Sequence, residues 1–215
     1  MSLLLDLIFP KTCYGCGQKG DYLCPNCQKN IHVLNTKAPQ NGFDGGLSLF
    51  KYDSAIKSAI IDLKYHFVSD NIDILVNFIV KTLKSDFPNL IKYWQQNNFI
   101  LIPIPLHPSR QNWRGFNQSQ LLAQKIASKL SLDFSDEIII RHQETMPQAR
   151  LKNTKDRTKN VVNIFSLNPN IGKIKHKNFI LFDDVSTTQS TLSSAQNTLK
   201  TLSPLHCWYL TLSAG

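Results

Sequence analysis

Two adjacent aspartates, Asp183 and Asp184, stand between an apolar run and a turn rich in hydroxyl side chains. The apolar run at residues 179–182, FILF, predicts a buried parallel strand, and a helical pattern begins at Leu192. Ligands of open α/β sheets bind where strands end and helices begin. The pattern therefore predicts a ligand site at this turn.

The chemistry of the turn suits a phosphorylated sugar. Backbone N–H groups in a tight turn that opens a helix can hold a phosphate, and the helix dipole adds partial positive charge. The two carboxylates can accept hydrogen bonds from sugar hydroxyls or face a metal ion. Hydroxyl donors are available from Thr187, Thr188, Ser190 and Thr191. The alternative is that Asp184 or Ser190 only caps a helix.

The stretch from Asn178 to Leu192 resembles the binding signature for phosphoribosyl pyrophosphate (PRPP) in type I phosphoribosyltransferases. That signature has apolar residues, two acids, an apolar residue and then a loop of Thr and Gly. The resemblance implies PRPP bound with Mg²⁺ and gives Asp183 and Asp184 the catalytic role. Where the family usually has glycine this chain has Gln189, which is strained at positive φ and brings a side chain into the turn. We therefore expect PRPP binding more firmly than catalysis.

Four cysteines near the N-terminus form two Cys-x-x-Cys pairs, Cys13 with Cys16 and Cys24 with Cys27. Four thiolates at about 2.3 Å from one ion form a tetrahedral site suited to Zn²⁺. Disulfides or a redox pair are the alternatives. Because the start of the chain lacks the basic flank and length of a signal peptide, a structural zinc site is favoured. The fifth cysteine, Cys207, is predicted to be a buried strand residue.

A second apolar run, Phe99 to Ile104, predicts another buried strand, and Arg110 and Arg114 follow before the next helical pattern. In a doubly wound sheet these arginines lie on the same edge as the two aspartates. Guanidinium groups match pyrophosphate oxygens in a bidentate manner, so both are candidates for a pyrophosphate clamp, with surface charge as the alternative. Asn117 with Gln120 resembles a capping box, which explains Asn117 structurally.

The net charge of +9 is concentrated in one segment. Between Arg141 and Asn178 there are nine Lys or Arg against two acidic residues, so this segment carries +7. Such a concentration predicts an anionic partner, and a solvated loop is the alternative. Aromatic residues are scarce from Arg141 to Val162, so contact with a nucleic-acid backbone is expected there rather than base stacking. The candidate nucleic-acid-binding residues are Arg141, Arg150, Lys152, Lys155, Arg157 and Lys159.

Several short motifs follow the four-cysteine module in order: Pro103-Ile-Pro-Leu-His-Pro-x-Arg110, Arg114-Gly-Phe-Asn-Gln118, Thr145-x-Pro-Gln148-x-x-Leu151, Arg157-x-x-Asn160-Val161 and Asp183-Asp184. Together they resemble the ComF family of competence proteins over nearly the whole chain. Members pair a zinc-ribbon-like module with a phosphoribosyltransferase-type domain and are implicated in moving transforming single-stranded DNA into the bacterial cytoplasm. The resemblance implies a helicase-like competence ATPase as a partner.

We therefore expect an α/β fold. Residues 41–215 would form a type I phosphoribosyltransferase-like parallel sheet flanked by helices, and residues 1–40 a small four-cysteine zinc module. No apolar run is long enough to span a bilayer, so a cytoplasmic protein is expected, with peripheral association with the inner membrane left open. The favoured function is a competence protein that binds PRPP, Mg²⁺ and single-stranded DNA during uptake. The alternative is an active phosphoribosyltransferase on an unknown acceptor.

Overall fold

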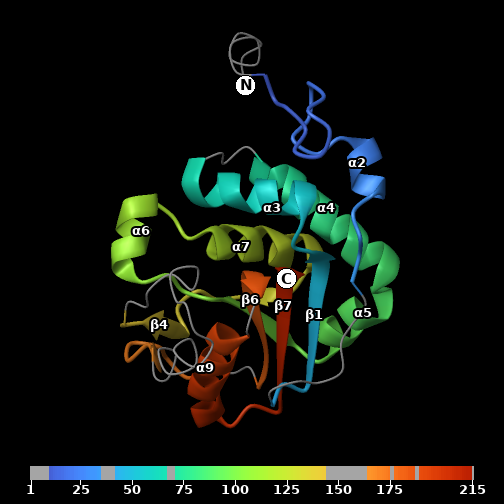
Figure 1. Ribbon diagram of the computed structural model, residues 1–215. Coiled ribbons are helices and arrows are strands. Elements are labelled where there is room, and N and C mark those ends of the chain that lie inside the picture. Colours follow the sequence, from blue (N-terminus) through green and yellow to red (C-terminus); the bar gives the residue numbers. More distant parts are fainter. Residues whose placement is uncertain are drawn as a thin grey trace.

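Figure 1 shows the computed structural model of the chain, which describes residues 10–34, 42–66, 71–143, 164–174, 177–186 and 189–214. In chain order its elements are α2 (Pro25–Lys29), β1 (Gly45–Lys51), α3 (Ser54–Ile61), the π-helix η1 (Asp62–His66), α4 (Asn71–Asp86), α5 (Pro88–Gln96), β2 (Phe99–Pro103), α6 (Pro108–Arg114), α7 (Gln118–Leu130), β3 (Asp133–Phe134), β4 (Ile139–Arg141), β5 (Phe165–Leu167), β6 (Asn178–Ser186), α9 (Ser190–Leu199), the 3-10 helix η3 (Lys200–Leu202) and β7 (His206–Ala214).

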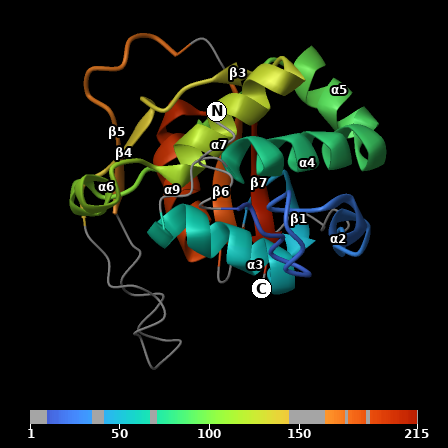
Figure 2. The ribbon, with the colours of Figure 1, turned by 90° about the horizontal axis from the view of Figure 1, so that it is seen from above.

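Five parallel strands form the main sheet in the order β1-β7-β6-β2-β3. Helices α3, α4, α5 and α7 cover one face, and α9 with the antiparallel pair β4 and β5 covers the other (Figures 1 and 2). A parallel sheet covered on both faces needs apolar residues on both sides of each strand. This requirement explains why β2 and the first part of β6 are continuous apolar runs rather than alternating ones.

Strand β6 shows how the two layers are built. Its side chains alternate between faces, so Phe179 and Leu181 pack with α9 whereas Ile180 and Phe182 pack with the α3, α4 and α7 layer. All four are fully buried, and burial of each such side chain contributes about 1.5–3 kcal/mol before entropy is counted. The aspartates that follow are therefore held at the end of a rigid, doubly covered strand.

The N-terminal segment packs directly on this domain. Leu23, 2% exposed, belongs to the main hydrophobic core, and Asn71 at the start of α4 donates a hydrogen bond to the Tyr14 hydroxyl at 2.9 Å. Residues 32–34 run along the outer edge of β1, where the Leu34 N–H donates to Leu49 O at 2.8 Å. The edge strand is thereby partly covered, which leaves less of its backbone open to pairing with another chain.

The predicted fold class is confirmed: a parallel sheet flanked by helices, with a four-cysteine cluster at the N-terminal end. The expected strands at 99–104 and 179–182 correspond to β2 and β6. Helix α3 continues at Asp62 as the π-helix η1, and α5 follows α4 directly. Among the described helices, none has the length and apolar character needed to cross a bilayer.

Candidate ligand site and metal centre

Asp183 and Asp184 lie inside β6 rather than after it, because β6 continues to pair with β7 as far as Ser186. On its other side β6 loses its neighbour earlier, since pairing with β2 ends at Phe182. The start of α7 fills the space that β2 leaves, as its contacts with both aspartates show. The two carboxylates therefore sit in a gap at the carboxyl edge of the sheet, where ligands of α/β proteins bind.

Asp184 is the centre of a buried polar network. Its side chain is 5% exposed, and Lys64 Nζ lies 3.0 Å from its Oδ1. Gln118 Nε2 donates to the other oxygen, Oδ2, at 2.8 Å, and Gln118 Oε1 in turn accepts a hydrogen bond from Arg114 Nη1. A buried carboxylate is tolerated when it is paired and hydrogen-bonded in this way. The network links η1, α6, α7 and β6 through one carboxylate.

Asp183 is held by two hydrogen bonds to the same oxygen. Ser119 Oγ donates to Oδ1 at 3.1 Å, and the Asp184 N–H donates to it at 2.9 Å. Burial raises the pKa of Asp183 to about 7, and the adjacent Asp184 carboxylate adds to the rise, although Lys64 opposes it. Two neighbouring carboxylates with one pKa close to neutrality are characteristic of binding and catalytic sites.

Lys64 is a residue of this network that is not among the predicted site residues. It lies in the π-helix η1, and π-turns inserted in α-helices frequently occur at functional sites. Burial alone would lower the pKa of Lys64, but the carboxylates of Asp184 and Asp183 outweigh it and raise that pKa. Lys64 is therefore a fixed positive charge. Nothing in the residue pattern distinguishes this π-turn from ordinary helix, so sequence alone could not have found it.

The two predicted arginines lie on a short helix rather than in an open loop. Helix α6 begins at Pro108 and ends at Arg114, with Gly115 as its C-cap. Its N-terminus is capped by His107 Nδ1, which accepts the Ser109 N–H. Gly115 has φ 80°, which glycine adopts without strain. This short helix places Arg110 and Arg114 between the end of β2 and the start of α7, as expected for the carboxyl edge of the sheet.

Arg114 is not surface charge, because it is 7% exposed. Its guanidinium carbon lies 5.7 Å from the centre of the Tyr65 ring. Burial lowers the pKa of Arg114, and the Asp184 carboxylate opposes that change. Among the atoms that the structure describes, Arg114 Nε is buried and has no hydrogen-bond acceptor. A buried donor without an acceptor is costly, so this atom is suited to an anionic ligand.

The resemblance of Asn117 and Gln120 to a capping box is half right. Asn117 Oδ1 accepts the Ser119 N–H at 3.0 Å and so caps α7, while its Nδ2 donates to Ile104 O at 3.0 Å. Gln120 does not return the contact, because its amide donates to Asp136 instead. The cap nevertheless fixes the start of α7, which brings Ser119 and its neighbour Gln118 to the two aspartates.

Gln189, just before α9, stands where the family usually has glycine, and the structure shows the backbone conformation that it adopts. Gln189 has φ 55° and ψ 2°, the left-handed conformation that glycine adopts without strain, and its Nε2 donates to the Tyr209 hydroxyl at 3.2 Å. Gln189 is also the N-cap of α9, so the alternative that Asp184 or Ser190 caps this helix is wrong. Ser190 and Thr191 open α9, and Thr187 and Thr188 lie outside the described residues.

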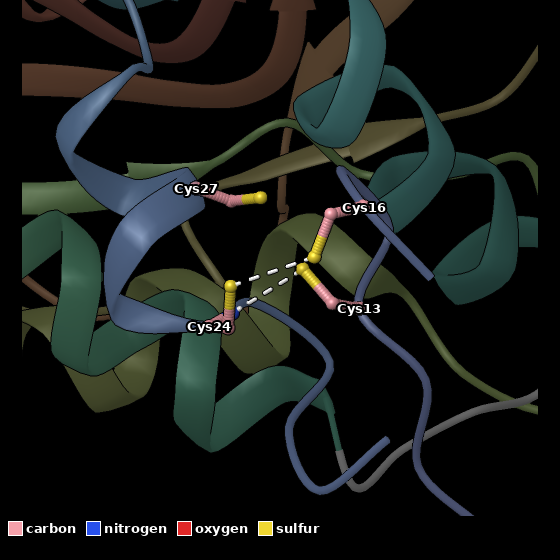
Figure 3. A group of neighbouring side chains, drawn as sticks. All are labelled: Cys13, Cys16, Cys24 and Cys27. Atoms are coloured by element: carbon pink, nitrogen blue, oxygen red, sulfur yellow. Dashed lines mark hydrogen bonds between the residues drawn. The ribbon is translucent and has the colours of Figure 1, made fainter. Parts of the chain in front are cut away.

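The four predicted zinc ligands converge at one point, as Figure 3 shows. Their sulfur atoms all lie within 4.8 Å of one another, and those of Cys16 and Cys24 are 3.8 Å apart. A tetrahedron with zinc–sulfur bonds of about 2.3 Å has sulfur–sulfur edges of about 3.8 Å. The four cysteines can therefore hold a zinc ion. Cys207 is free and buried in β7, as predicted.

The Cys13 and Cys27 thiols of this cluster do not ionise equally, because one thiolate disfavours the ionisation of its neighbour. Burial raises the pKa of Cys13, but backbone N–H groups of Cys24, Cys16 and Gly15 outweigh it and lower the pKa to about 6. Hydrogen bonding with Cys13 and Cys24 raises the pKa of Cys27 to about 12. One thiolate thus suppresses another, and a divalent cation is the ligand that allows all four to ionise.

The predicted nucleic-acid-binding residues are only partly described. Arg141 ends β4 and is 9% exposed, with its guanidinium carbon 5.6 Å from the centre of the Phe165 ring. Its Nε also donates to Gln143 O at 3.3 Å. These contacts give Arg141 a structural role. The five other candidates, Arg150, Lys152, Lys155, Arg157 and Lys159, lie outside the described residues.

The chain is similar to competence proteins of two bacteria. It is 37% identical over 102 residues to competence protein F of Haemophilus influenzae, which covers 47% of this chain and 44% of that protein. It is 25% identical over 208 residues to competence protein ComFC of Bacillus subtilis, which covers 88% of this chain and 78% of that protein. The chain is a ComF-family protein. No family model matches this ComF-family chain.

A third relative of this ComF-family protein is the DNA utilization protein YhgH of Escherichia coli K12, 32% identical over 93 residues, or 43% of this chain and 39% of that protein. The chain thus matches less than half of competence protein F and of YhgH. Solved adenine phosphoribosyltransferases are distant neighbours. The one from Leishmania donovani has 14% identity and a TM-score of 0.34, covering 72% of this chain and 54% of that one. The one from Leishmania tarentolae has 12% identity and a TM-score of 0.39, and the match covers 84% of this chain and 94% of that one.

Proposed function

We propose that this ComF-family protein binds PRPP at the carboxyl edge of its sheet and acts in the uptake of transforming single-stranded DNA. The observation that carries the proposal is the set of polar side chains from η1, α6 and α7 that surround two adjacent carboxylates of β6, namely Lys64, Arg114, Gln118 and Ser119 around Asp183 and Asp184. Acceptors for hydroxyl groups beside donors for phosphate oxygens match the two chemistries of PRPP.

Each group has a distinct task in this proposal. The two carboxylates accept hydrogen bonds from the ribose hydroxyls. Arg114, whose buried Nε has no acceptor in the described structure, donates to the pyrophosphate together with Arg110. Among the described residues, the backbone N–H groups of Gln189, Ser190 and Thr191 at the start of α9 bind the 5′-phosphate. Lys64 neutralises Asp184 in the free protein, so the site is held ready without unpaired buried charge.

We propose that Mg²⁺ enters the site bound to PRPP. Mg²⁺ takes oxygen ligands, keeps several waters and usually binds to one or two carboxylates plus phosphates. Both oxygens of Asp184 are engaged, one by Lys64 and one by Gln118, whereas the two contacts of Asp183 use the same oxygen. We therefore propose Asp183 as the protein ligand of a PRPP-bound Mg²⁺, which would neutralise charge on the pyrophosphate.

Single-stranded DNA is proposed to bind through the basic segment between Arg141 and Asn178, which carries +7. Phosphate contacts release counterions, so the affinity should fall steeply with salt. A protein that neutralises six phosphates loses on the order of a thousandfold between 50 and 200 mM salt. An affinity that does not change with salt would exclude binding through phosphates.

As the family resemblance implies, the site of action is proposed to be cytoplasmic, beside a helicase-like competence ATPase and peripheral to the inner membrane.

The function is tested by complementation. A strain that lacks the gene is transformed with marked DNA, and rescue is compared for the wild type, Asp183→Asn/Asp184→Asn and the matched control Asp73→Asn. Asp73 is an exposed aspartate on α4 that pairs with Lys125 and is not one of the candidate site residues. We expect rescue by the wild type and by the control but not by the double variant. Normal transformation by the deletion strain would refute the competence role.

An active phosphoribosyltransferase is the second candidate. Two carboxylates at the site could stabilise the positive charge that develops on the ribose as pyrophosphate leaves. The left-handed Gln189 counts against full activity, because a residue with a side chain is strained at this positive φ, where the family usually has glycine. The test is pyrophosphate release from PRPP across a panel of acceptors, using the wild type and Gln189→Gly. Release above spontaneous hydrolysis, increased in Gln189→Gly, would favour the enzyme.

We propose that residues 1–40 act as a zinc-stabilised module whose boundary with the phosphoribosyltransferase-like domain lies near residue 40. Leu23 packs into the main core and Tyr14 accepts a hydrogen bond from Asn71, so the module supports the domain rather than standing apart from it. A docking role for a partner is the alternative. It would be favoured if Cys13→Ser abolished partner binding without changing the melting temperature or the DNA affinity.

A further inference from the structure

Two aromatic side chains lie exposed next to the candidate site. Tyr65 is 53% exposed and Trp113 is 62% exposed, and their ring centres are 6.2 Å apart at an interplanar angle of 62°. In the described part of the chain the other large hydrophobic side chains that are exposed are both aliphatic, Ile140 and Leu205. Two large rings held together in water are unusual in a stable protein surface and indicate a binding surface.

The pair is built into the elements that hold the candidate site. Tyr65 follows Lys64, which pairs with Asp184, and Trp113 precedes Arg114, which lies over the Tyr65 ring. In both ribbon views the end of the α3 segment approaches α6, which brings these rings together (Figures 1 and 2). The aromatic surface therefore adjoins buried cations without being part of the carboxylate network.

We infer that Tyr65 and Trp113 form a stacking surface for an unpaired nucleobase. Exposed aromatic rings beside arginine are the combination by which proteins bind single-stranded nucleic acid, because every base offers a face to stack on. A base inside a duplex is not accessible in this way. The inference rests on the proposed ligand site at the same edge of the sheet, and it adds base stacking to the backbone contact expected from the basic segment.

Intrinsic fluorescence reports on this surface directly. Trp94 is fully buried and Trp208 is partly buried against it, so Trp113 is the tryptophan most open to a ligand. The full-length protein is titrated with a short oligothymidylate, with an abasic oligomer of equal length and charge, and with free nucleosides. We expect saturable quenching by the oligothymidylate and little by the abasic oligomer, and the nucleoside arm tells a DNA base from a free base.

Affinity for a labelled oligothymidylate, followed by anisotropy, separates stacking from folding. Stacking of one base is worth about 1–3 kcal/mol, so Trp113→Ala should bind at least about fivefold more weakly. Trp113→Phe should keep the affinity within about twofold while removing the fluorescence change. Leu205→Ala is the matched control, because Leu205 is 68% exposed and aliphatic. The affinity of this variant for the oligothymidylate should equal that of the wild type.

The outcomes distinguish this inference from the proposed function. Unchanged affinity in Trp113→Ala, with equal binding of the abasic oligomer, would overturn stacking and leave electrostatic DNA binding intact. Quenching by nucleosides without oligonucleotide binding would support the stacking surface and refute the DNA part of the proposed function. Absence of quenching by the oligothymidylate and by the nucleosides would overturn the inference, whatever the result of PRPP titrations.

Discussion

Replacement of Asp183 by Asn should stabilise the ligand-free protein at alkaline pH. In the folded chain, burial and the adjacent Asp184 carboxylate raise the pKa of Asp183 to about 7, from an ordinary value of 3.8. The folded state therefore holds a proton that the unfolded state has released. As the pH rises from about 4 through 7, the folded state loses this advantage, and its stability falls.

The size of the effect follows from the difference in pKa. One pKa unit is worth about 1.4 kcal/mol, and about half to two thirds of the titration difference accumulates between pH 5 and pH 8. The wild type should thus lose about 1–3 kcal/mol of unfolding free energy over that interval through Asp183. Lys64 does not add to the slope, because its raised pKa keeps it charged throughout. Asp183→Asn removes the titrating group and should flatten the profile.

Urea unfolding of the ligand-free protein at pH 5.0, 6.5 and 8.0 measures this difference. Asp73→Asn serves as the control, because its side chain is 68% exposed and exposed ion pairs contribute little. We expect the control to follow the wild type at every pH, whereas Asp183→Asn becomes more stable than the wild type at pH 8.0. Parallel profiles for the wild type and Asp183→Asn would refute the argument that Asp183 is held in a charge-disfavouring site.

Three further predictions concern the framework of the two sites. Lys64→Met leaves its carboxylate partner buried without a cation, so urea unfolding at pH 7.5 should show a loss of about 2–3 kcal/mol, and no loss would exclude the ion pair. Cys16→Ser should lose the zinc that a colorimetric chelator detects after unfolding, whereas Cys207→Ala should retain it. Gly46→Ala should cost about 2–3 kcal/mol, because the added Cβ would overlap the Tyr209 ring, and unchanged stability would show that the ring can move.

The sheet could be predicted from sequence because its strands are uniform. Residues 99–103 and 178–182 are buried on both faces, and such runs bounded by turns leave few alternatives to parallel strands. The cysteine cluster was equally predictable, since the spacing of two Cys-x-x-Cys pairs indicates which sulfur atoms can bind one ion. These features depend on local patterns, which a single sequence displays.

The site was less predictable because its key contacts are tertiary. Lys64 contacts Asp184, which lies 120 positions later in the sequence, and Lys64 is placed there by the π-helix η1. Gln118 stood within a recognised motif, yet its contact with Asp184 depends on where β2 stops pairing with β6. The half-formed capping box has the same cause, because a tertiary partner, Asp136, takes the Gln120 amide. Gln189 is the exception: its strain was expected from sequence and is observed.

The central claim is that the carboxyl edge of the sheet binds PRPP through Asp183 and Asp184, and calorimetric titration with PRPP tests it most directly. The wild type, Asp183→Asn/Asp184→Asn and Asp73→Asn are compared with and without Mg²⁺, after melting curves show that all are folded. We predict Mg²⁺-dependent binding by the wild type and Asp73→Asn that is lost in the double variant. Absence of binding by the wild type at millimolar PRPP, or equal binding by the double variant, would contradict the claim.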